Sequence, residues 1–201
     1  MKPEERQELY AQGLEIHRRH PVIDTHSHFL LMAHHLGKDF SKRHGHAWFW
    51  NPFRNVLDLP RLQEGAVACS TFTIYVPPPP LRMSAWKACG RYLDGLDRLV
   101  EASAGRVRKV DSAEGIRQAF AAGVLAGLPA VEGGHVIGRK LERLEALRSR
   151  GVRILTLTHF IANRICDASI KPEVHGGLSG FGRGVLEECE RLGLVVELSN
   201  A

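Results

Sequence analysis

Two histidines separated by a single residue follow a short run of β-branched residues near the start of the chain. Val22 to Asp24 favour a strand, and His26 and His28 come at its end. Because alternate side chains of a strand point to the same face, both imidazoles can face one side of a sheet. Imidazole suits zinc and similar divalent metals. The pair is therefore a candidate metal site, although two histidines in a polar turn would have the same spacing.

Two further polar residues end strand-like segments later in the chain. Glu132 follows a nearly apolar run and precedes Gly133 and Gly134, which would let the backbone pass close to a ligand. A carboxylate there is costly unless it is paired or binds a metal, and one carboxylate can bridge two metal ions. His159 could be a metal ligand, an oxyanion donor or a general acid–base group. A capping or salt-bridged Glu132 and a hydrogen-bonded structural His159 are the alternatives.

Several periodic segments would position these side chains. Short β-branched and aliphatic runs predict five strands, over residues 22–28, 66–76, 128–131, 153–158 and 194–198. Helical spacing of apolar residues predicts helices over residues 4–19, 84–103, 112–122, 138–150 and 180–192. Residues 34–55 and 160–179 have no clear period and are expected to be loops. In the first loop we expect solvated histidines at His34, His35, His44 and His46, whereas His135, just after Glu132, is expected to pack in a loop.

The alternation of strands and helices predicts βα units and a parallel sheet. The ionisable residues gather at the carboxyl ends of the strands, where both (β/α)8 barrels and doubly wound sheets bind ligands. No G-x-G-x-x-G follows the first strand and no P-loop occurs, which disfavours nucleotide binding. At about 40 residues per unit, eight units would need about 320 residues. We therefore expect residues 1–201 to be a single incomplete barrel domain with about five βα units.

Composition excludes several other classes. The chain is 44% hydrophobic and 24% charged, which is ordinary for a globular domain. The net charge of +5 comes from arginines and lysines that are scattered without interleaved aromatic residues, so we expect no nucleic-acid binding. Four scattered cysteines form no C-x-x-C pair and are expected to be reduced thiols. Without an apolar signal core or a long apolar run, we expect no transmembrane segment and a cytoplasmic location.

Several segments match one known family in order and spacing. Residues 131–135 read V-E-G-G-H, and residues 153–159 read R-I-L-T-L-T-H. Further matching segments are Tyr75-Val76-Pro77, Asn163, Asp167-Ala168-Ser169 and Gly177 to Gly182. Together, from residue 21 onward, they resemble the renal or membrane dipeptidase family, the M19 metallopeptidases of the amidohydrolase superfamily.

This resemblance implies a (β/α)8 barrel of the metallo-dependent hydrolase kind that hydrolyses dipeptides with two zinc ions. By position, His26 resembles the first-strand ligand, Glu132 the carboxylate that bridges both metals, and His159 the histidine that contacts the tetrahedral intermediate. A hydroxide shared by the two metals would attack the scissile carbonyl, because the metals act as Lewis acids and lower the pKa of that water. His159 would stabilise the oxyanion. Tyr75 and Asn163 are the candidates for a pocket that holds a small dipeptide-like substrate.

The sequence departs from the family pattern in three ways. His28 stands where the family usually has an aspartate, and it can still bind a metal. Asn200 stands where the family has a histidine that binds the second metal, so we expect a weak ligand or a residue that supports one. The family's second histidine for that metal, its substrate-carboxylate arginine and its acid–base aspartate would lie beyond residue 201.

These departures leave other functions open. One is a related amidohydrolase that acts on another amide or on a lactone, and another is a truncated, non-catalytic remnant. A partial parallel barrel has two open edges. We expect a homodimer or a missing C-terminal half to cover them.

Overall fold

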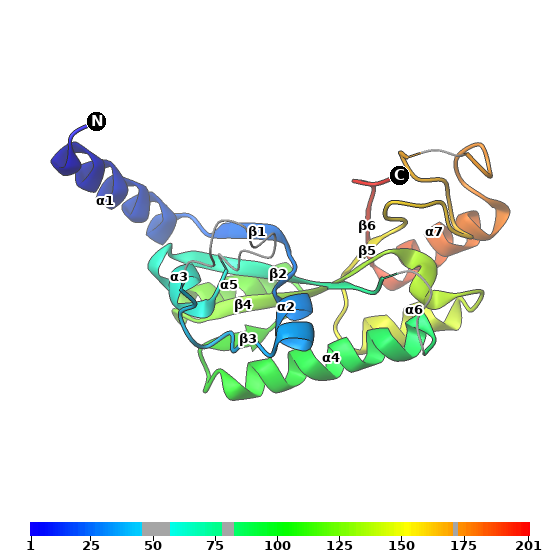
Figure 1. The fold of residues 1–201 in the computed structure, drawn as a ribbon, viewed down its shortest axis with the longest axis horizontal. Coiled ribbons are helices and arrows are strands. Elements are labelled where there is room, and N and C mark those ends of the chain that lie inside the picture. The colour runs from blue at the N-terminus through cyan, green and yellow to red at the C-terminus, as the bar shows by residue number, and fades with distance from the viewer. Residues whose placement is uncertain (46–56, 78–82, 171–172) are drawn as a thin grey trace.

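A single parallel sheet forms the centre of the computed structural model, which describes residues 1–45, 57–77, 83–170 and 173–201. The sheet order is β1-β2-β4-β5-β6, and β3 pairs with β4 as well (Figure 1). The six strands are β1 (Val22–Ser27), β2 (Val67–Tyr75), β3 (Val107–Lys109), β4 (Leu125–Glu132), β5 (Ile154–Thr156) and β6 (Val195–Glu197). The sheet curls as a partial (β/α) barrel, as predicted.

Helices connect the strands and cover the sheet. They are α1 (Pro3–Arg19), α2 (Phe29–Leu36), α3 (Leu59–Glu64), α4 (Ala85–Ala102), α5 (Ala113–Ala121), the 3-10 helix η1 (Gly134–Ile137), α6 (Glu142–Ser149) and α7 (Gly180–Leu192). Serine hydroxyls accept hydrogen bonds from free backbone amides at the start of α4, α5 and α7, and thereby cap these helices. Among the described helices, none has the length and apolar character needed to cross a membrane.

The connections around β3 explain why helices lie on both faces of the sheet. α4 leads from β2 past β4 to β3, and α5 then leads back from β3 to β4. Because both crossovers of a parallel sheet are right-handed, two connections that run in opposite directions lie on opposite faces. Accordingly, Phe72 of β2 belongs to the main core with Leu96 of α4, whereas Cys69 and Ala126 form a second cluster with Ala119 of α5.

This arrangement also decides which face carries the polar residues. Tyr75 lies an even number of residues from Cys69 on β2, and Glu132 lies an even number from Ala126 on β4. Alternate residues of a strand share a face, so Tyr75 and Glu132 are on the same face as α5. α5 covers the amino-terminal part of that face. The carboxyl ends of the strands are therefore available to form a site.

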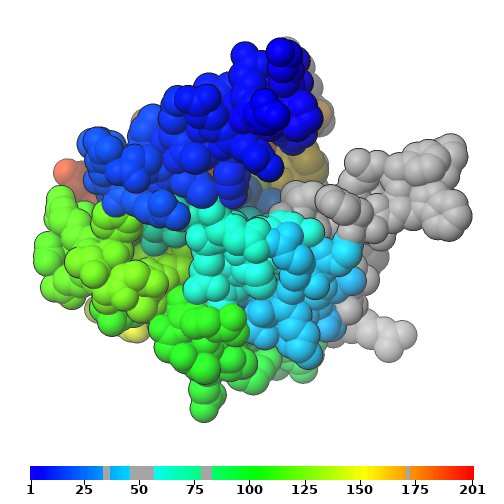
Figure 2. Space-filling view, turned by 90° about the vertical axis from the view of Figure 1, so that its left-hand side faces the viewer, coloured from blue at the N-terminus to red at the C-terminus, as the bar shows by residue number. Residues whose placement is uncertain are grey.

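The N-terminal helix α1 contributes little to the core. It has no buried residue and projects away from the sheet (Figure 1). Seen from that end of the molecule, it stands in front of the other elements (Figure 2). A hydrogen bond between His17 Nδ1 and the Gly65 carbonyl, 2.8 Å, fastens its last turn next to the start of β2.

The predicted helices 4–19, 84–103, 112–122 and 180–192 are confirmed to within about one residue at each end. Other expectations were wrong. The sequence prediction missed β3, which is only three residues long, and started β4 three residues late. The helix predicted over residues 138–150 is shorter: the 3-10 helix η1 ends at Ile137, and α6 begins only at Glu142. Gly138 separates the two because it has a positive φ of 65°.

The first predicted loop also needs correction. Residues 34–36 end α2, and α3 follows the loop. His44 lies in this loop and is partly exposed; its Nε2 lies 2.7 Å from the Asp39 carbonyl, and its backbone amide donates to Asp58. His46 lies outside the described residues. The four cysteines are free and buried, as expected for reduced thiols.

Candidate metal centre

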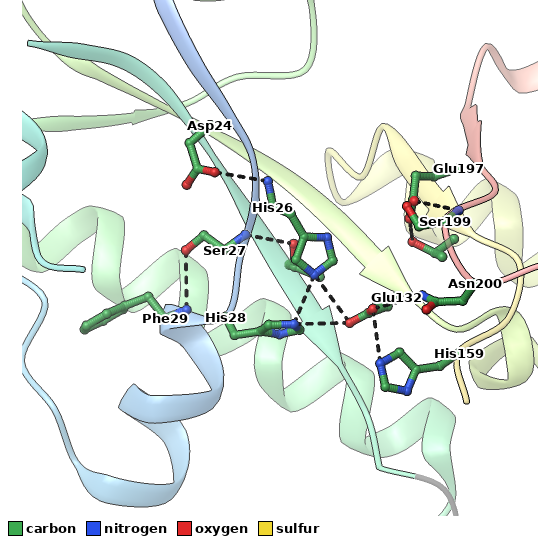
Figure 3. Close-up of polar contacts among 12 residues, drawn as sticks. Asp24, His26, Ser27, His28, Phe29, Glu132, His159, Glu197, Ser199 and Asn200 are labelled. Carbon is green, nitrogen blue, oxygen red and sulfur yellow. Dashed lines mark hydrogen bonds and ion pairs between the residues drawn. The ribbon is translucent and has the colours of Figure 1, made fainter. Parts of the chain in front are cut away.

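Three side chains from β1, the start of α2 and β4 converge at the carboxyl end of the sheet (Figure 3). His26 Nε2 and His28 Nε2 are 3.0 Å apart, and they lie 3.6 and 3.4 Å from Oε2 of Glu132. One ligand atom from each residue falls within 4.8 Å of the other two. His26 lies in β1 and His28 follows the end of that strand, and together they bring both imidazoles to one point, as the sequence predicts.

The other oxygen of the same carboxylate faces different partners. His159 Nε2 lies 3.3 Å from Glu132 Oε1, and Asn200 Nδ2 donates to that oxygen over 3.4 Å. His159 follows β5 and Asn200 follows β6, so four strands of the sheet contribute to the cluster. Glu132 is thus shared between a pair of histidines on one side and two N–H groups on the other.

The surroundings of Oε2 fit those of a metal ligand. The side chain of Glu132 is only 4% exposed. Nevertheless Oε2 has no hydrogen-bond partner among the described residues, and neither has the buried Nδ1 of His28. Two imidazole nitrogens at 3.0 Å can share one proton at most, and a buried carboxylate oxygen without a donor is costly. Two imidazoles and a carboxylate are a donor set that suits zinc and related divalent ions.

The pKa values of the two histidines are shifted in opposite directions. The neighbouring Glu132 carboxylate raises the pKa of His26 above its ordinary value, although partial burial opposes this. Burial lowers the pKa of His28. Burial would raise the pKa of Glu132, but the nearby His26, His159 and His28 outweigh it and hold that pKa below its usual range. Glu132 is therefore ionised near neutral pH, and His28 offers a neutral ring.

The segment after Glu132 fixes the carboxylate in place. The backbone amides of Gly133 and Gly134 donate to the carbonyls of Thr156 and Leu157, both over 3.0 Å. Gly133 has a φ of 95°, and a Cβ on Gly134 would come within 2.9 Å of the Leu157 oxygen. The two glycines therefore permit a close approach to the backbone after β5.

His135 is a structural residue, in line with the sequence prediction. Its Nε2 lies 2.9 Å from the carbonyl oxygen of Val76, which follows β2. Burial lowers the pKa of His135, so the ring is neutral and donates from Nε2. This bond ties the segment after β4 to the segment after β2 and keeps Tyr75 beside the cluster.

The two substrate-pocket candidates lie near each other but differ in character. Tyr75 packs against His159, with ring centroids 4.4 Å apart and ring planes tilted by 45°, and burial raises the pKa of its hydroxyl. The Asn163 side chain bonds to backbone groups: its Nδ2 donates to the Leu157 carbonyl over 2.7 Å, and its Oδ1 accepts from the Ile165 amide over 2.7 Å. Both line a pocket of about 420 Å³ next to His159.

Sequence reasoning missed two side chains of this pocket, Phe160 and Ile161. They follow His159 directly in a segment without period, which was predicted only as a loop. The available signal was their apolar character in a polar loop.

The chain was compared with known proteins. The model of the membrane dipeptidase family, peptidase family M19, matches residues 10–201. Dipeptidase 3 of Rattus norvegicus is 29% identical over 198 residues, which is 96% of this chain and 39% of that protein. Dipeptidase verJ of Clonostachys rogersoniana is 30% identical over 154 residues, 71% of this chain and 40% of that protein. The chain thus spans about two fifths of the length of these relatives.

Solved structures share the fold. The probable dipeptidase PvdM from Pseudomonas aeruginosa superposes with a TM-score of 0.83 over 96% of this chain and 50% of that chain, at 20% identity. A metallopeptidase from Rhodobacter sphaeroides, solved with a phosphinate mimic of the dipeptide L-Ala-D-Ala, has a TM-score of 0.73 and 26% identity over 89% of this chain and 58% of that chain. By the family match over nearly its whole length, this chain belongs to the membrane dipeptidase family, peptidase family M19.

Proposed function

We propose that this chain serves a metal-dependent hydrolase that cleaves the peptide bond of dipeptides, with His26, His28 and Glu132 as ligands of a zinc ion. The observation that carries the proposal is the buried Oε2 of Glu132, which faces both imidazoles and has no hydrogen-bond donor among the described residues. The similarity to dipeptidases supports the substrate class. We also propose that residues 1–201 belong to one barrel domain.

The residues around the cluster have distinct tasks in this proposal. When bound there, zinc would supply Lewis acidity and lower the pKa of a water molecule. His28, a neutral ring, binds through Nε2, and His26 must release its proton to bind, so metal uptake weakens in acid. His159 holds a proton on Nε2, which faces Glu132 Oε1, and can donate it to an oxygen of the substrate.

One observation favours a second candidate, a related amidohydrolase that acts on another amide or on a lactone. Glu132 Oε1 is approached by N–H groups of Asn200 and His159. Asn200 brings a neutral amide, a weaker ligand than imidazole. A site that binds one metal instead of two would differ in which amide or ester bonds it hydrolyses.

Hydrolysis assays on the zinc-loaded chain test the proposal. We expect release of free amino acids from a panel of dipeptides, and loss of this activity in Glu132→Gln. The exposed Glu187→Gln is the matched control. Cleavage of N-acyl amino acids or lactones without cleavage of dipeptides would instead establish the second candidate, and cleavage of neither class would contradict both.

A further inference from the structure

The pocket beside the cluster differs from the cluster in chemistry. The pocket has a volume of about 420 Å³ and lies next to His159. Aromatic and aliphatic side chains line it, among them Tyr75, Phe160 and Ile161. Its described lining contains no lysine, arginine, aspartate or glutamate. The volume is typical of a site for a small molecule, and such sites are mostly apolar with a few polar groups that orient the ligand.

Two of the polar side chains that line the pocket, those of His135 and Asn163, already bond within the protein. His135 Nε2 is bonded to the Val76 carbonyl. The Asn163 side chain bonds to backbone groups at Leu157 and Ile165 through both of its polar atoms. A ligand group in this pocket would thus meet mainly the faces of Tyr75, Phe160 and Ile161.

Phe160 and Ile161 are exposed although they are large and apolar. The two residues are 60% and 56% exposed. The rings of His159 and Phe160 are 3.9 Å apart between centroids, so this apolar surface begins directly at the candidate catalytic histidine. Adjoining exposed apolar side chains that border a pocket are typical of binding sites.

Hydrogen bonds hold this segment in its exposed position. Thr158 Oγ1 donates to the Ile161 carbonyl over 2.7 Å, and the Asn163 backbone amide donates to Cys166 over 3.0 Å. His175 Nε2 lies 2.7 Å from the Asn163 carbonyl. The segment is therefore ordered before a ligand arrives, which lowers the entropic cost of binding.

One buried carboxylate organises the rest of the loop. Asp167 accepts hydrogen bonds from the backbone amides of Val174, His175 and Gly177, at 2.7, 3.0 and 2.8 Å. These amides hold the pKa of Asp167 below its usual range. Through His175, the same loop supports Asn163 and with it the pocket wall.

We propose that this pocket, with Phe160 and Ile161 as its specificity-determining residues, binds an apolar or aromatic side chain of the substrate. The inference rests on the proposed function, because the substrate is taken to be a dipeptide whose scissile carbonyl lies beside His159, next to the metal centre. One of the two residues of the dipeptide then carries the side chain that enters the pocket. A dipeptide with a charged side chain at that position finds no partner in the described lining.

Phosphinate dipeptide mimics test this assignment, with binding to the zinc-loaded chain measured by calorimetry. The probes are the mimic of Ala-Ala and the mimics of Phe-Ala and Ala-Phe. We expect one benzyl-bearing mimic to bind at least about tenfold more tightly than the methyl mimic. Phe160→Ala is expected to reduce that ratio to near one, and Phe160→Leu to retain part of it. The ratio of the kcat/KM values of the corresponding dipeptides is expected to change in the same direction as the ratio of the mimic affinities.

Val174→Ala is the matched control, because Val174 is exposed in the same loop, 64%, and does not line the pocket. It is expected to leave the ratio unchanged. Mimics that bind with a ratio near one, or a ratio that survives Phe160→Ala, would overturn the pocket assignment and leave the proposed function standing. If no mimic binds and no dipeptide is cleaved, the proposed function fails and the pocket assignment fails with it.

Discussion

Glu132 and His159 meet with Oε1 and Nε2 3.3 Å apart, although one ends β4 and the other follows β5. The contact leaves Oε2 of the same carboxylate facing His26 and His28. A single buried side chain therefore joins a potential metal-binding pair to a potential proton donor.

His159→Ala is expected to lower kcat for dipeptide hydrolysis about a hundredfold or more, because an N–H donor to the developing oxyanion is lost. Zinc content should stay the same, because His26, His28 and Glu132 remain. His159→Gln, which keeps an N–H group, should recover part of the activity. The exposed His20→Ala serves as control. Unchanged turnover in His159→Ala would show that this histidine has another role.

Asp58 is expected to stabilise the fold in a pH-dependent manner. This fully buried carboxylate caps α3 and accepts from the backbone amides of Arg61 and His44, and from the Arg61 guanidinium. Burial would raise its pKa, but these partners outweigh burial and lower the pKa below the ordinary 3.8. A carboxylate with a lower pKa in the folded state stabilises the protein above the unfolded value and loses this effect as the pH falls through the folded one.

Asp58→Asn should therefore lower the free energy of unfolding at pH 7 by about 2 kcal/mol, as measured by urea denaturation. The difference from the unmodified chain should shrink as the pH falls below about 4. Asp111→Asn removes a half-exposed partner of Arg148 and should cost less than about 1 kcal/mol. An equal effect of Asp58→Asn at pH 7 and pH 3 would contradict the assigned ionisation.

Two glycines in the first turn of α7 should respond oppositely to alanine. A Cβ on Gly182 would lie 2.1 Å from the backbone oxygen of Ile165, whereas one on Gly180 would meet nothing within 4 Å. Gly182→Ala should thus destabilise the protein by about 1–3 kcal/mol. Gly180→Ala should be neutral or stabilise by up to about 1 kcal/mol, because alanine is the better helix former. Thermal denaturation of both variants measures this, and equal effects would refute the close packing of α7 on Ile165.

Much of the fold could be predicted because the helices with clear apolar periodicity, such as 180–192, are amphipathic and capped. The meeting of His26, His28 and Glu132 was also predictable, since the carboxyl ends of parallel strands lie at one edge whatever the details of the crossovers. The short β3 was not, because three residues carry no period and their pairing with β4 is a tertiary contact.

The pocket wall could not be predicted for a similar reason. Phe160 and Ile161 are held outward by hydrogen bonds of Thr158 and Asn163 to backbone groups. Such bonds leave no pattern in hydrophobicity. The close approach of Gly134 to the carbonyl of Leu157 could likewise not be predicted, because the two residues are 23 positions apart in the sequence and adjacent only in the folded sheet.

Metal content per chain, measured by mass spectrometry after zinc loading and gel filtration, tests the central claim most directly. We predict at least one zinc ion per chain, lost in both His26→Ala and Glu132→Gln and retained in the controls His20→Ala and Glu187→Gln. Absence of zinc from the unmodified chain, or its retention in the two site variants, would contradict the assignment of His26, His28 and Glu132 as the metal centre.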